Sequence, residues 1–389
     1  MTLITHTKFS TAKKLKLGFV GGGKGAIIGE IHANGARLSN RWDIVAGCLS
    51  SNPKKAKESG KEWLLEPDRI YTSFKEMAAA EAKRSNAIDA VVIATPNALH
   101  YPIAKEFITK GINVISDKPL CINSKEANHL IQLKKKHKVF FGVTYPYTSH
   151  VMVKQAKAMI DTGKIGKIKQ VHVEYFQEWA VNVSDHDTST TPWRLNKKIN
   201  GPSFTTADIG THAFQLLNYV TGKKIKSLMA KFYVTGKKKK MEDTAFMHLE
   251  LADKIPATLM ISQVMIGQQC GISIRVAGDK GYLEWHQENP ENLIFSKFNQ
   301  PKQILMRGYG DHMDKSVLPF VRMPAGHPEA LTDAWANLYL SFAQGIDDHN
   351  KSKKSKKIPY YPTIEEGAEG VRFVEAAMKS NKNNKWINL

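Results

Sequence analysis

The chain has 389 residues, enough for two or three domains at about 150 residues each, and its 42% hydrophobic and 24% charged residues are typical of a globular protein. This composition excludes disordered, collagen-like and disulfide-scaffold classes. The formal net charge of +20 makes nucleic acid or an anionic membrane a partner to consider. The lysines gather in short polar clusters at 134–136, 237–240 and 351–357 without interleaved aromatic residues, which favours a solvated surface over specific nucleic-acid binding.

The three cysteines, Cys48, Cys121 and Cys270, are widely spaced and form no CxxC pair. This spacing predicts small buried thiols and neither a disulfide framework nor a metal site. Residues 1–14 lack an apolar signal core, and no apolar run approaches the roughly 20 residues that a bilayer span needs. We therefore expect a cytoplasmic protein with no membrane partner.

From residue 15 to 143 short apolar strands alternate with amphipathic helices, the pattern of parallel βαβ units. The expected strands are 17–21, 44–49, a short one near 70, 90–94, 114–116 and 139–143. The expected helices are 29–38, 53–63, 73–84, 99–110 and 124–136, the last opened by Asn123 and Glu126 at capping-box spacing. Six strands predict a complete doubly wound Rossmann domain over residues 15–143, after an N-terminal tail of residues 1–14.

After an expected helix at 151–161 the pattern changes to longer alternating strands, at 169–177, 227–234, 245–251, 257–264, 273–277 and 282–285. Residues 144–389 are therefore predicted to form an α+β domain with a large, mostly antiparallel sheet. Helices at 208–220 and 331–344 are expected to cover one face, and the last helix, 364–379, to pack on either domain. The uncovered face needs solvent or another subunit, which predicts a homo-oligomer.

A glycine-rich turn of the GxGxxA form follows the first strand and opens a helix. It contains Gly21, Gly23, Lys24 and Ala26. Glycines let the backbone turn tightly and approach a pyrophosphate, whose charge lies at the positive end of the helix. A glycine turn without a ligand is the alternative, but the place of this turn at the head of an α/β domain favours a dinucleotide site.

The end of the second strand is where an acidic residue would select NAD by binding the ribose 2′-hydroxyl. No carboxylate stands there, and the sequence has Ser50, Ser51 and Lys54 instead. This leaves room for a 2′-phosphate, so the predicted cofactor is NAD or NADP. Lys54 could equally be a solvated residue of the next helix.

The fourth and fifth strands end in polar segments that point to the same cleft, because ligands of open α/β sheets lie outside the carboxyl ends of the strands. The fourth strand leads to Thr95, Asn97 and His100, and the fifth to Asp117 and Lys118. Lys118 could accept an alcohol proton while a hydride leaves the adjacent carbon. The alternatives are a solvated loop lysine and, for His100, a polar residue at a helix start.

Asp208 and His212 stand four residues apart at the start of a predicted helix, with His212 on its apolar stripe. A carboxylate that orients an imidazole makes an acid/base or hydroxyl-binding unit. The alternative is Asp208 as a helix N-cap and His212 as a core histidine.

Together these motifs resemble the Gfo/Idh/MocA family, named after glucose-fructose oxidoreductase, inositol dehydrogenase and rhizopine catabolism. Residues 324–329, PAGHPE, resemble its branch of levoglucosan dehydrogenase-like enzymes. The resemblance covers nearly the whole chain and implies a reaction centre of Lys118, Asp208 and His212. It also implies that the nicotinamide side is lined by Thr95, Asn97 and His100.

Several positions differ from the family pattern or resemble it more loosely. Asp117 stands where the family usually has Glu, a change expected to keep the charge near Lys118. Tyr147 is expected to contact the substrate, although the neighbouring Pro146 replaces a residue that is often polar in relatives. The segment 191–194, with Trp193 and Arg194, resembles a loop that closes on cofactor and substrate; a core tryptophan and a surface arginine are the alternative.

The resemblance implies an NAD(P)-dependent dehydrogenase that oxidises a secondary hydroxyl of a sugar, anhydrosugar or cyclic polyol. It further implies a homodimer or homotetramer formed through the large sheet. One alternative is a redox-neutral glycosidase or epimerase of the same family that keeps its NAD bound. Another, from a different class, is a non-catalytic dinucleotide-binding sensor.

Overall fold

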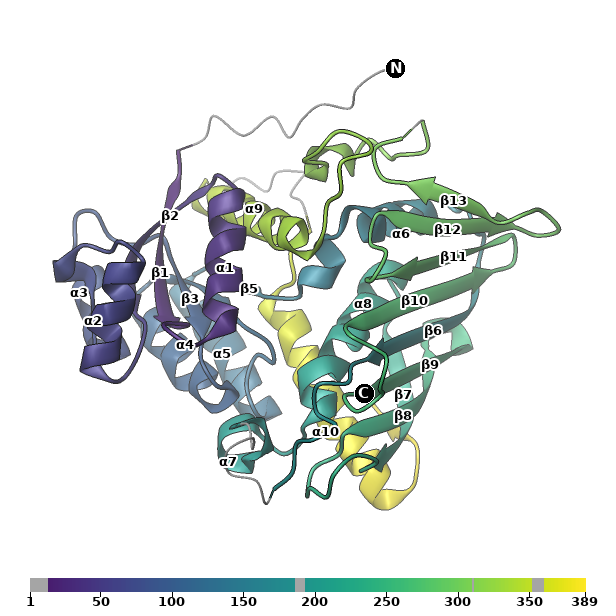
Figure 1. The fold of residues 1–389 in the computed structure, drawn as a ribbon, viewed down its shortest axis with the longest axis horizontal. Helices are drawn as coiled ribbons and strands as arrows, with labels where there is room; N and C mark the ends of the chain where they lie inside the picture. Colours follow the sequence, from purple (N-terminus) through teal and green to yellow (C-terminus); the bar gives the residue numbers. More distant parts are fainter. Residues whose placement is uncertain (1–12, 186–192, 310, 352–359) are drawn as a thin grey trace. The chain divides into compact units, whose positions relative to one another are not determined.

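The computed structural model describes residues 13–185, 193–309, 311–351 and 360–389, which form two compact units, each built around one sheet (Figure 1). The parallel-sheet unit comprises residues 13–145, 332–351 and 360–369. The antiparallel-sheet unit comprises residues 146–185, 193–309, 311–331 and 370–389. Most of the predicted N-terminal tail, residues 1–12, lies outside the described residues.

The parallel-sheet unit contains five strands in the order β2-β1-β3-β4-β5, all parallel. The strands are β1 (Leu15–Gly21), β2 (Trp42–Cys48), β3 (Ala90–Ala94), β4 (Asn113–Ser116) and β5 (Phe141–Val143). The helices between them are α1 (Ile27–Leu38), α2 (Pro53–Glu62), α3 (Phe74–Glu81), α4 (His100–Thr109) and α5 (Ser124–His137). The central strand β3 is apolar and buried throughout, as a parallel strand covered on both faces should be. Asn123 caps α5 as predicted, since its side chain accepts from the N–H of Glu126.

The prediction of a short strand near residue 70, the third of the six expected strands, is wrong. Ile70 makes a single parallel bridge to Gly47 and extends no further as a strand. A short 3-10 helix, Pro67–Arg69, precedes it, and the buried guanidinium of Arg69 binds Glu81 of α3 at 2.5 Å. An ion pair therefore holds this segment to α3, and a single bridge joins it to β2.

The helix expected at 331–344 extends over α9 (Leu331–Asn350), and its expected packing on the antiparallel sheet is wrong. It packs within the parallel-sheet unit: Tyr339 Oη lies 2.7 Å from Nδ1 of His32, and Trp42 Nε1 donates to the Tyr339 carbonyl at 3.0 Å. A Cβ added at Gly35 of α1 would lie 2.8 Å from Cβ of Trp335, so this approach needs a glycine. An apolar stripe shows that a helix is buried but not which sheet buries it.

The antiparallel-sheet unit contains nine strands in the order β13-β12-β11-β10-β6-β9-β8-β7-β14, with one parallel pair, β6 and β9. The strands are β6 (Ile168–Phe176), β7 (Ile225–Tyr233), β8 (Thr244–Leu251), β9 (Ile255–Ser262), β10 (Gly271–Gly278), β11 (Gly281–His286), β12 (Asn292–Lys297), β13 (Gln303–Met306) and β14 (Ile387–Asn388). The sequence analysis predicted neither β12 nor β13 nor β14. For the last two the reason is their size, because β13 is short and largely exposed and β14 has two residues.

The helices α6 (Val151–Asp161) and α8 (Thr211–Thr221) lie along one face of this sheet (Figure 1). Inward residues alternate with outward ones, as in β8, where Ala245, Met247 and Leu249 are buried between exposed neighbours. The last helix, α10 (Ile364–Asn383), begins in the parallel-sheet unit and ends in the antiparallel-sheet unit. Among the helices in the described ranges, none combines the length and the apolar composition that crossing a bilayer requires.

One lysine of the cluster at 237–240 departs from the expected solvated surface. The side chain of Lys239 is fully buried, and its ammonium lies 2.7 Å from Oδ2 of the equally buried Asp243. Asp243 also accepts from the N–H groups of Thr235 and Gly236. The expectation is wrong for Lys239 because a buried carboxylate at the start of β8 needs a positive partner.

Candidate active site

The glycine turn after β1 is shaped by close backbone contacts on one side and open space on the other. At Gly21, with φ of +83°, an added Cβ would lie 2.3 Å from the carbonyl oxygen of Ala94 at the end of β3. At Gly22 it would lie 2.6 Å from Cα of Gly29 in α1. At Gly25, with φ of +85°, no described atom lies within 4 Å. The turn thus leaves a bare backbone surface, which is what a pyrophosphate requires.

The N-terminus of α1 has no cap from its N-cap residue. This residue is Ala26, whose methyl group makes no capping hydrogen bond, and the N–H of Gly29 donates to the Ala26 carbonyl at 3.1 Å. The N–H groups at a helix start and the helix dipole favour an anion there. The ammonium of Lys24 lies 3.0 Å from Oε1 of Glu62, and this hydrogen bond and charge raise the pKa of Lys24. The residues present fit the pyrophosphate of a dinucleotide.

The segment after β2, predicted to meet the ribose, forms the start of α2. Ser50 Oγ accepts from the N–H of Asn52, and the Asn52 side chain caps α2 by accepting from the N–H of Lys55 at 3.1 Å. Ser51 and Lys54 are exposed. The local turn therefore occupies Ser50 and leaves Ser51 and Lys54 accessible.

His100 ties together the two polar segments that follow β3 and β4. It is 1% exposed, and its Nδ1 and Nε2 each lie 2.7 Å from a carbonyl oxygen, of Pro119 and Thr95 respectively. Burial lowers the pKa of His100, although the charge of Asp117 and both carbonyls oppose this effect. The buried ring thus links the backbone at Thr95 to the backbone at Pro119, the residue after Lys118. The hydroxyl of Thr95 is buried and has no hydrogen-bond partner in the described part of the chain, so it is available to a ligand.

Asp117 holds the backbone of Lys118. Its Oδ1 accepts from the N–H of Lys118 at 2.9 Å and from the hydroxyl of Thr144 at 2.7 Å, and Nε2 of His32 lies 3.9 Å away. Burial alone would raise the pKa of Asp117, but His32, Lys118 and Thr144 together hold it well below its usual range. Asp117 is therefore a fixed negative charge next to Lys118. Position 117 therefore carries a carboxylate beside Lys118, as expected for Asp in place of Glu.

The helix expected from Asp208 begins differently in the structure. A π-helical turn, Thr206–Gly210, precedes α8, and Asp208 lies inside this turn. The alternative of Asp208 as a helix N-cap is therefore wrong, because the helical backbone starts before it. The N–H of Asp208 donates to the carbonyl of Phe204 at 3.0 Å. Single π-helical turns are frequent at functional sites.

Gln263 and Arg194, which belong to other segments, contact Asp208. Its Oδ2 accepts from Nε2 of Gln263 at 2.8 Å, and Nε of Arg194 lies 3.4 Å from the same oxygen. The guanidinium of Arg194 lies 4.7 Å from the ring centre of Trp193. The structure thus brings the predicted residue Arg194 to the predicted residue Asp208. Residues 191 and 192 of the same predicted loop lie outside the described residues.

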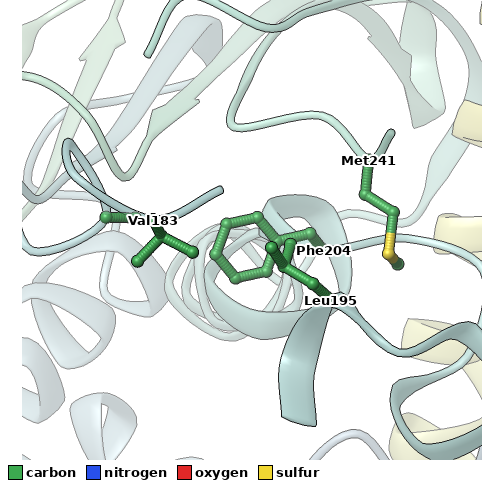
Figure 2. Close-up of a cluster of buried hydrophobic side chains, with 5 residues drawn as sticks. Val183, Leu195, Phe204 and Met241 are labelled. Atoms are coloured by element: carbon green, nitrogen blue, oxygen red, sulfur yellow. The ribbon is translucent and has the colours of Figure 1, made fainter. Parts of the chain in front are cut away.

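A small apolar cluster supports this pair (Figure 2). It contains Val183, Leu195, Phe204 and Met241, all buried, with Ala180 and Val264 beside them. Leu195 directly follows Arg194, and Phe204 is one turn before Asp208. Packing of these two apolar side chains therefore fixes the two backbone segments that carry the ion pair.

His212 and Tyr147 lie against each other on the inner side of the antiparallel sheet. His212 is 9% exposed, and its ring meets that of Tyr147 edge-to-face with centroids 4.9 Å apart. The Tyr147 hydroxyl lies 2.5 Å from that of Tyr175, and Sγ of Cys270 lies 3.1 Å from the Tyr175 hydroxyl. Burial raises the pKa of both phenols well above 10, so they remain neutral hydroxyls.

The environment of Cys270 corrects the expectation for the cysteines. Cys48 and Cys121 are buried as predicted, and burial raises the pKa of Cys48 to about 11. Cys270 is partly exposed and touches two phenol hydroxyls, so its assignment as a buried apolar residue is wrong. Cys270 directly precedes β10 and continues the inward-facing row of this strand.

Tyr175, Gln177 and Gln263 were not among the residues predicted for the site, although the sequence carries a signal for them. Inward positions of β6 read Val171, Val173, Tyr175, and Gln177 continues the row past the strand; in β9, Gln263 continues the inward row of Leu259 and Ile261. Polar residues in an apolar row mark a place where the sheet faces something other than its core. Reading the alternation beyond the strand ends would have found them.

Comparisons with known proteins agree with this architecture. Residues 15–145 match the family model of an oxidoreductase family with an NAD-binding Rossmann fold, and residues 157–389 match the model of the C-terminal alpha/beta domain of the same family, Gfo/Idh/MocA. The uncharacterized oxidoreductase YfiI of Bacillus subtilis (strain 168) is 32% identical over 382 residues, 97% of each chain.

Two further relatives carry descriptions of what they bind or oxidise. An inositol dehydrogenase homolog from Azotobacter vinelandii, complexed with NADH and myo-inositol, is 33% identical with a TM-score of 0.89, covering 97% of this chain and 98% of that one. The levoglucosan dehydrogenase of Pseudarthrobacter phenanthrenivorans is 33% identical over 135 residues, 35% of this chain and 33% of that protein. With both family models matched along nearly its whole length, the chain belongs to the Gfo/Idh/MocA family of oxidoreductases and carries that family's NAD-binding Rossmann domain.

Proposed function

We propose that the protein is an NAD(P)-dependent dehydrogenase that oxidises a secondary hydroxyl of a sugar, anhydrosugar or cyclic polyol. The observation that supports this most directly is the carboxylate of Asp208, held by Gln263 and Arg194 in a π-helical turn. This fixed carboxylate is close in sequence to His212, and the ring of His212 lies against that of Tyr147 on the inner side of the sheet. Together these groups offer several hydrogen bonds to a polyhydroxylated ligand. The myo-inositol complex of the Azotobacter relative supports the same substrate class.

The proposed roles follow from the chemistry of alcohol oxidation. The bound nicotinamide supplies an acceptor for the hydride that leaves the substrate carbon. Lys118 accepts the hydroxyl proton, with His212 as its partner in proton transfer. Asp208 orients His212 and binds a neighbouring hydroxyl. Asp117 contributes by fixing the Lys118 backbone through the 2.9 Å hydrogen bond.

The cofactor side is proposed to hold the pyrophosphate at Gly21, Gly23 and Ala26. Ser51 and Lys54, exposed after β2, are proposed to tolerate the 2′-phosphate of NADP, since no carboxylate follows the strand to repel it. Thr95, with its buried hydroxyl, is proposed to face the nicotinamide.

We further propose that the protein is a homodimer or homotetramer that assembles through the outer face of the antiparallel sheet. Phe246 of β8 and Tyr233 of β7 are each 46% exposed on this face, and their ring centres lie 5.9 Å apart. Exposed aromatic pairs on a sheet favour burial against another surface. A second copy of the same sheet offers such a surface.

The test is a screen of sugars, anhydrosugars and cyclic polyols, including myo-inositol and levoglucosan, with NAD and with NADP, followed by absorbance of the reduced cofactor. Net reduction supports the dehydrogenase and excludes a redox-neutral enzyme, which returns its cofactor unchanged. Lys118→Ala should lower turnover about a hundredfold to ten-thousandfold while cofactor still binds. The matched control is Lys110→Ala, an exposed lysine at the end of α4. Cofactor binding without turnover of any compound would contradict the proposal.

A further inference from the structure

Gln263, which immediately follows β9, has every hydrogen-bonding group of its amide engaged. It is fully buried; its Nε2 donates to Oδ2 of Asp208 at 2.8 Å and to Oε1 of Gln177 at 3.2 Å. Its Oε1 accepts from the hydroxyl of Thr205 at 2.8 Å. Because a carboxylate can only accept, Asp208 requires the NH2 side of the amide, and the Thr205 hydroxyl satisfies the opposite side. The orientation of Gln263 is thus fixed from three directions.

Further contacts connect Gln263 and Arg194 around Asp208. Oε1 of Gln177 also accepts from Nε1 of Trp179 at 3.1 Å, and the Trp179 ring lies 5.8 Å from the guanidinium of Arg194, which pairs with Asp208. Arg194 is 35% exposed and its attraction is screened by water, whereas Gln263 is fully enclosed. The amide is therefore the stronger constraint on the carboxylate.

We propose that Gln263 is a positioning residue that keeps Asp208 ionised and holds its carboxylate in one orientation. This inference rests on the proposed function of Asp208. A hydrogen bond to the charged form of an acid favours that form. Both amide hydrogens of Gln263 are donated, one to Gln177 and one to Asp208. Gln263 therefore keeps all its hydrogen bonds when the Asp208 oxygen is an acceptor, as it is in the ionised form. Loss of the amide would remove the fully buried donor of the carboxylate, whereas Arg194 is partly exposed.

The variant Gln263→Glu tests this because it keeps the shape of the side chain and exchanges the amide for a second carboxyl. Two carboxyls at hydrogen-bond distance cannot both ionise without strong repulsion, so the pair retains a proton to a higher pH than an unfolded carboxyl does. A group with a raised folded-state pKa stabilises the fold below its unfolded pKa, and this contribution is lost as pH rises. Gln263→Glu should therefore resemble the wild type near pH 5 and weaken toward pH 8.

The first measurement is the thermal unfolding midpoint of the cofactor-free full chain between pH 5 and pH 8. For Gln263→Glu we expect the deficit relative to wild type to grow by at least about 3 °C over this range. The double variant Asp208→Asn/Gln263→Glu exchanges amide and carboxylate, so one donor and one acceptor still face each other and the growth should disappear. A deficit that does not grow, or that grows equally in the double variant, would overturn the inference.

The second measurement is kcat/KM on a substrate that the screen identifies. The ratio of Gln263→Glu to wild type should fall at least about tenfold from pH 6 to pH 8, while Gln263→Met should be low at both. The matched control is Gln155→Glu, a buried glutamine of α6 that bonds the backbone of His312 and Asp314; its ratio should not change with pH.

The two measurements separate the inference from the proposed function. If Asp208→Asn inactivates the enzyme but Gln263→Glu follows the wild-type pH profile, the positioning role is wrong and the proposed function stands. If no compound is oxidised, the proposed function fails, and the unfolding series still decides whether Gln263 holds Asp208 ionised.

Discussion

Replacing Lys154 by methionine should stabilise the protein at neutral pH. Lys154 lies in α6, is 5% exposed, and has its ammonium 4.3 Å from the ring centre of Phe320 and 5.9 Å from that of Tyr219. Burial lowers the pKa of Lys154 from 10.5 to about 7. Methionine has a similar length and no charge, so it fills the same space without this desolvation.

The size of the effect follows from the shift and its opposing contact. A pKa lowered from 10.5 to about 7 corresponds to a cost of about 5 kcal/mol, at about 1.4 kcal/mol per unit. A desolvated cation over an aromatic ring recovers about 2 kcal/mol. The variant Lys154→Met should therefore be more stable than the wild type by about 3 kcal/mol at pH 7.

The pH dependence gives the prediction its sign. Because the folded-state pKa lies below the unfolded one, the unfolded wild type binds more protons between pH 7 and pH 10, and the wild type gains stability as pH rises. The advantage of Lys154→Met should thus shrink by about 1 kcal/mol from pH 7 to pH 9, because the cation–π contact offsets part of the pKa shift.

Urea unfolding midpoints at pH 7, 8 and 9 measure this difference. Lys157→Met, on the same helix, removes a partly exposed lysine paired with Asp161 at 2.9 Å and should change stability by less than about 1 kcal/mol. A variant Lys154→Met that is no more stable than the wild type at pH 7, or whose advantage is constant with pH, would refute the reasoning.

Three other outcomes are expected. Gly23→Val should abolish NAD(P) binding in calorimetry. It should also lower the unfolding midpoint, because its Cβ would lie 2.6 Å from the carbonyl oxygen of Leu49. Unchanged cofactor affinity would show that the glycine turn is not the cofactor site. NADP should bind within about a thousandfold of NAD, about 4 kcal/mol, and Lys54→Glu should weaken NADP selectively in fluorescence titration; a larger NAD preference would point to another excluding acid. Light scattering should show an oligomer at micromolar concentration that Phe246→Glu dissociates, whereas a monomeric wild type would rule out assembly through the sheet.

The elements of the fold were largely predictable because periodicity reports local burial. All five strands of the parallel sheet and the helices between them appear within a few residues of their expected positions. The errors arise where a distant contact decides. Arg69 next to residue 70 pairs with Glu81 of α3, and Gly35 allows Trp335 and its helix to pack closely on α1 of the parallel-sheet unit.

The sequence pointed to the residues proposed to react, and it did not point to the residues that hold them in place. Spacing and strand ends pointed to Asp208, because such positions follow from the local chain. The π-helical turn around Asp208 and its hydrogen bond to Gln263 join residues 55 positions apart, and no local pattern encodes such a pair. Even so, the polar residue in the inward row of β9 was visible in the sequence as a departure from alternation.

Both carboxylates of the candidate site accept hydrogen bonds from neutral neighbouring groups. Asp117 is held by the Thr144 hydroxyl and the Lys118 N–H, and Asp208 by the amide of Gln263. A hydroxyl or an amide has no charge to lose between pH 5 and pH 9, so these bonds persist across the range in which an alcohol dehydrogenase works. In the proposed mechanism the proton moves through Lys118 and His212, while these hydrogen bonds hold the carboxylates of Asp117 and Asp208 in place across the same range.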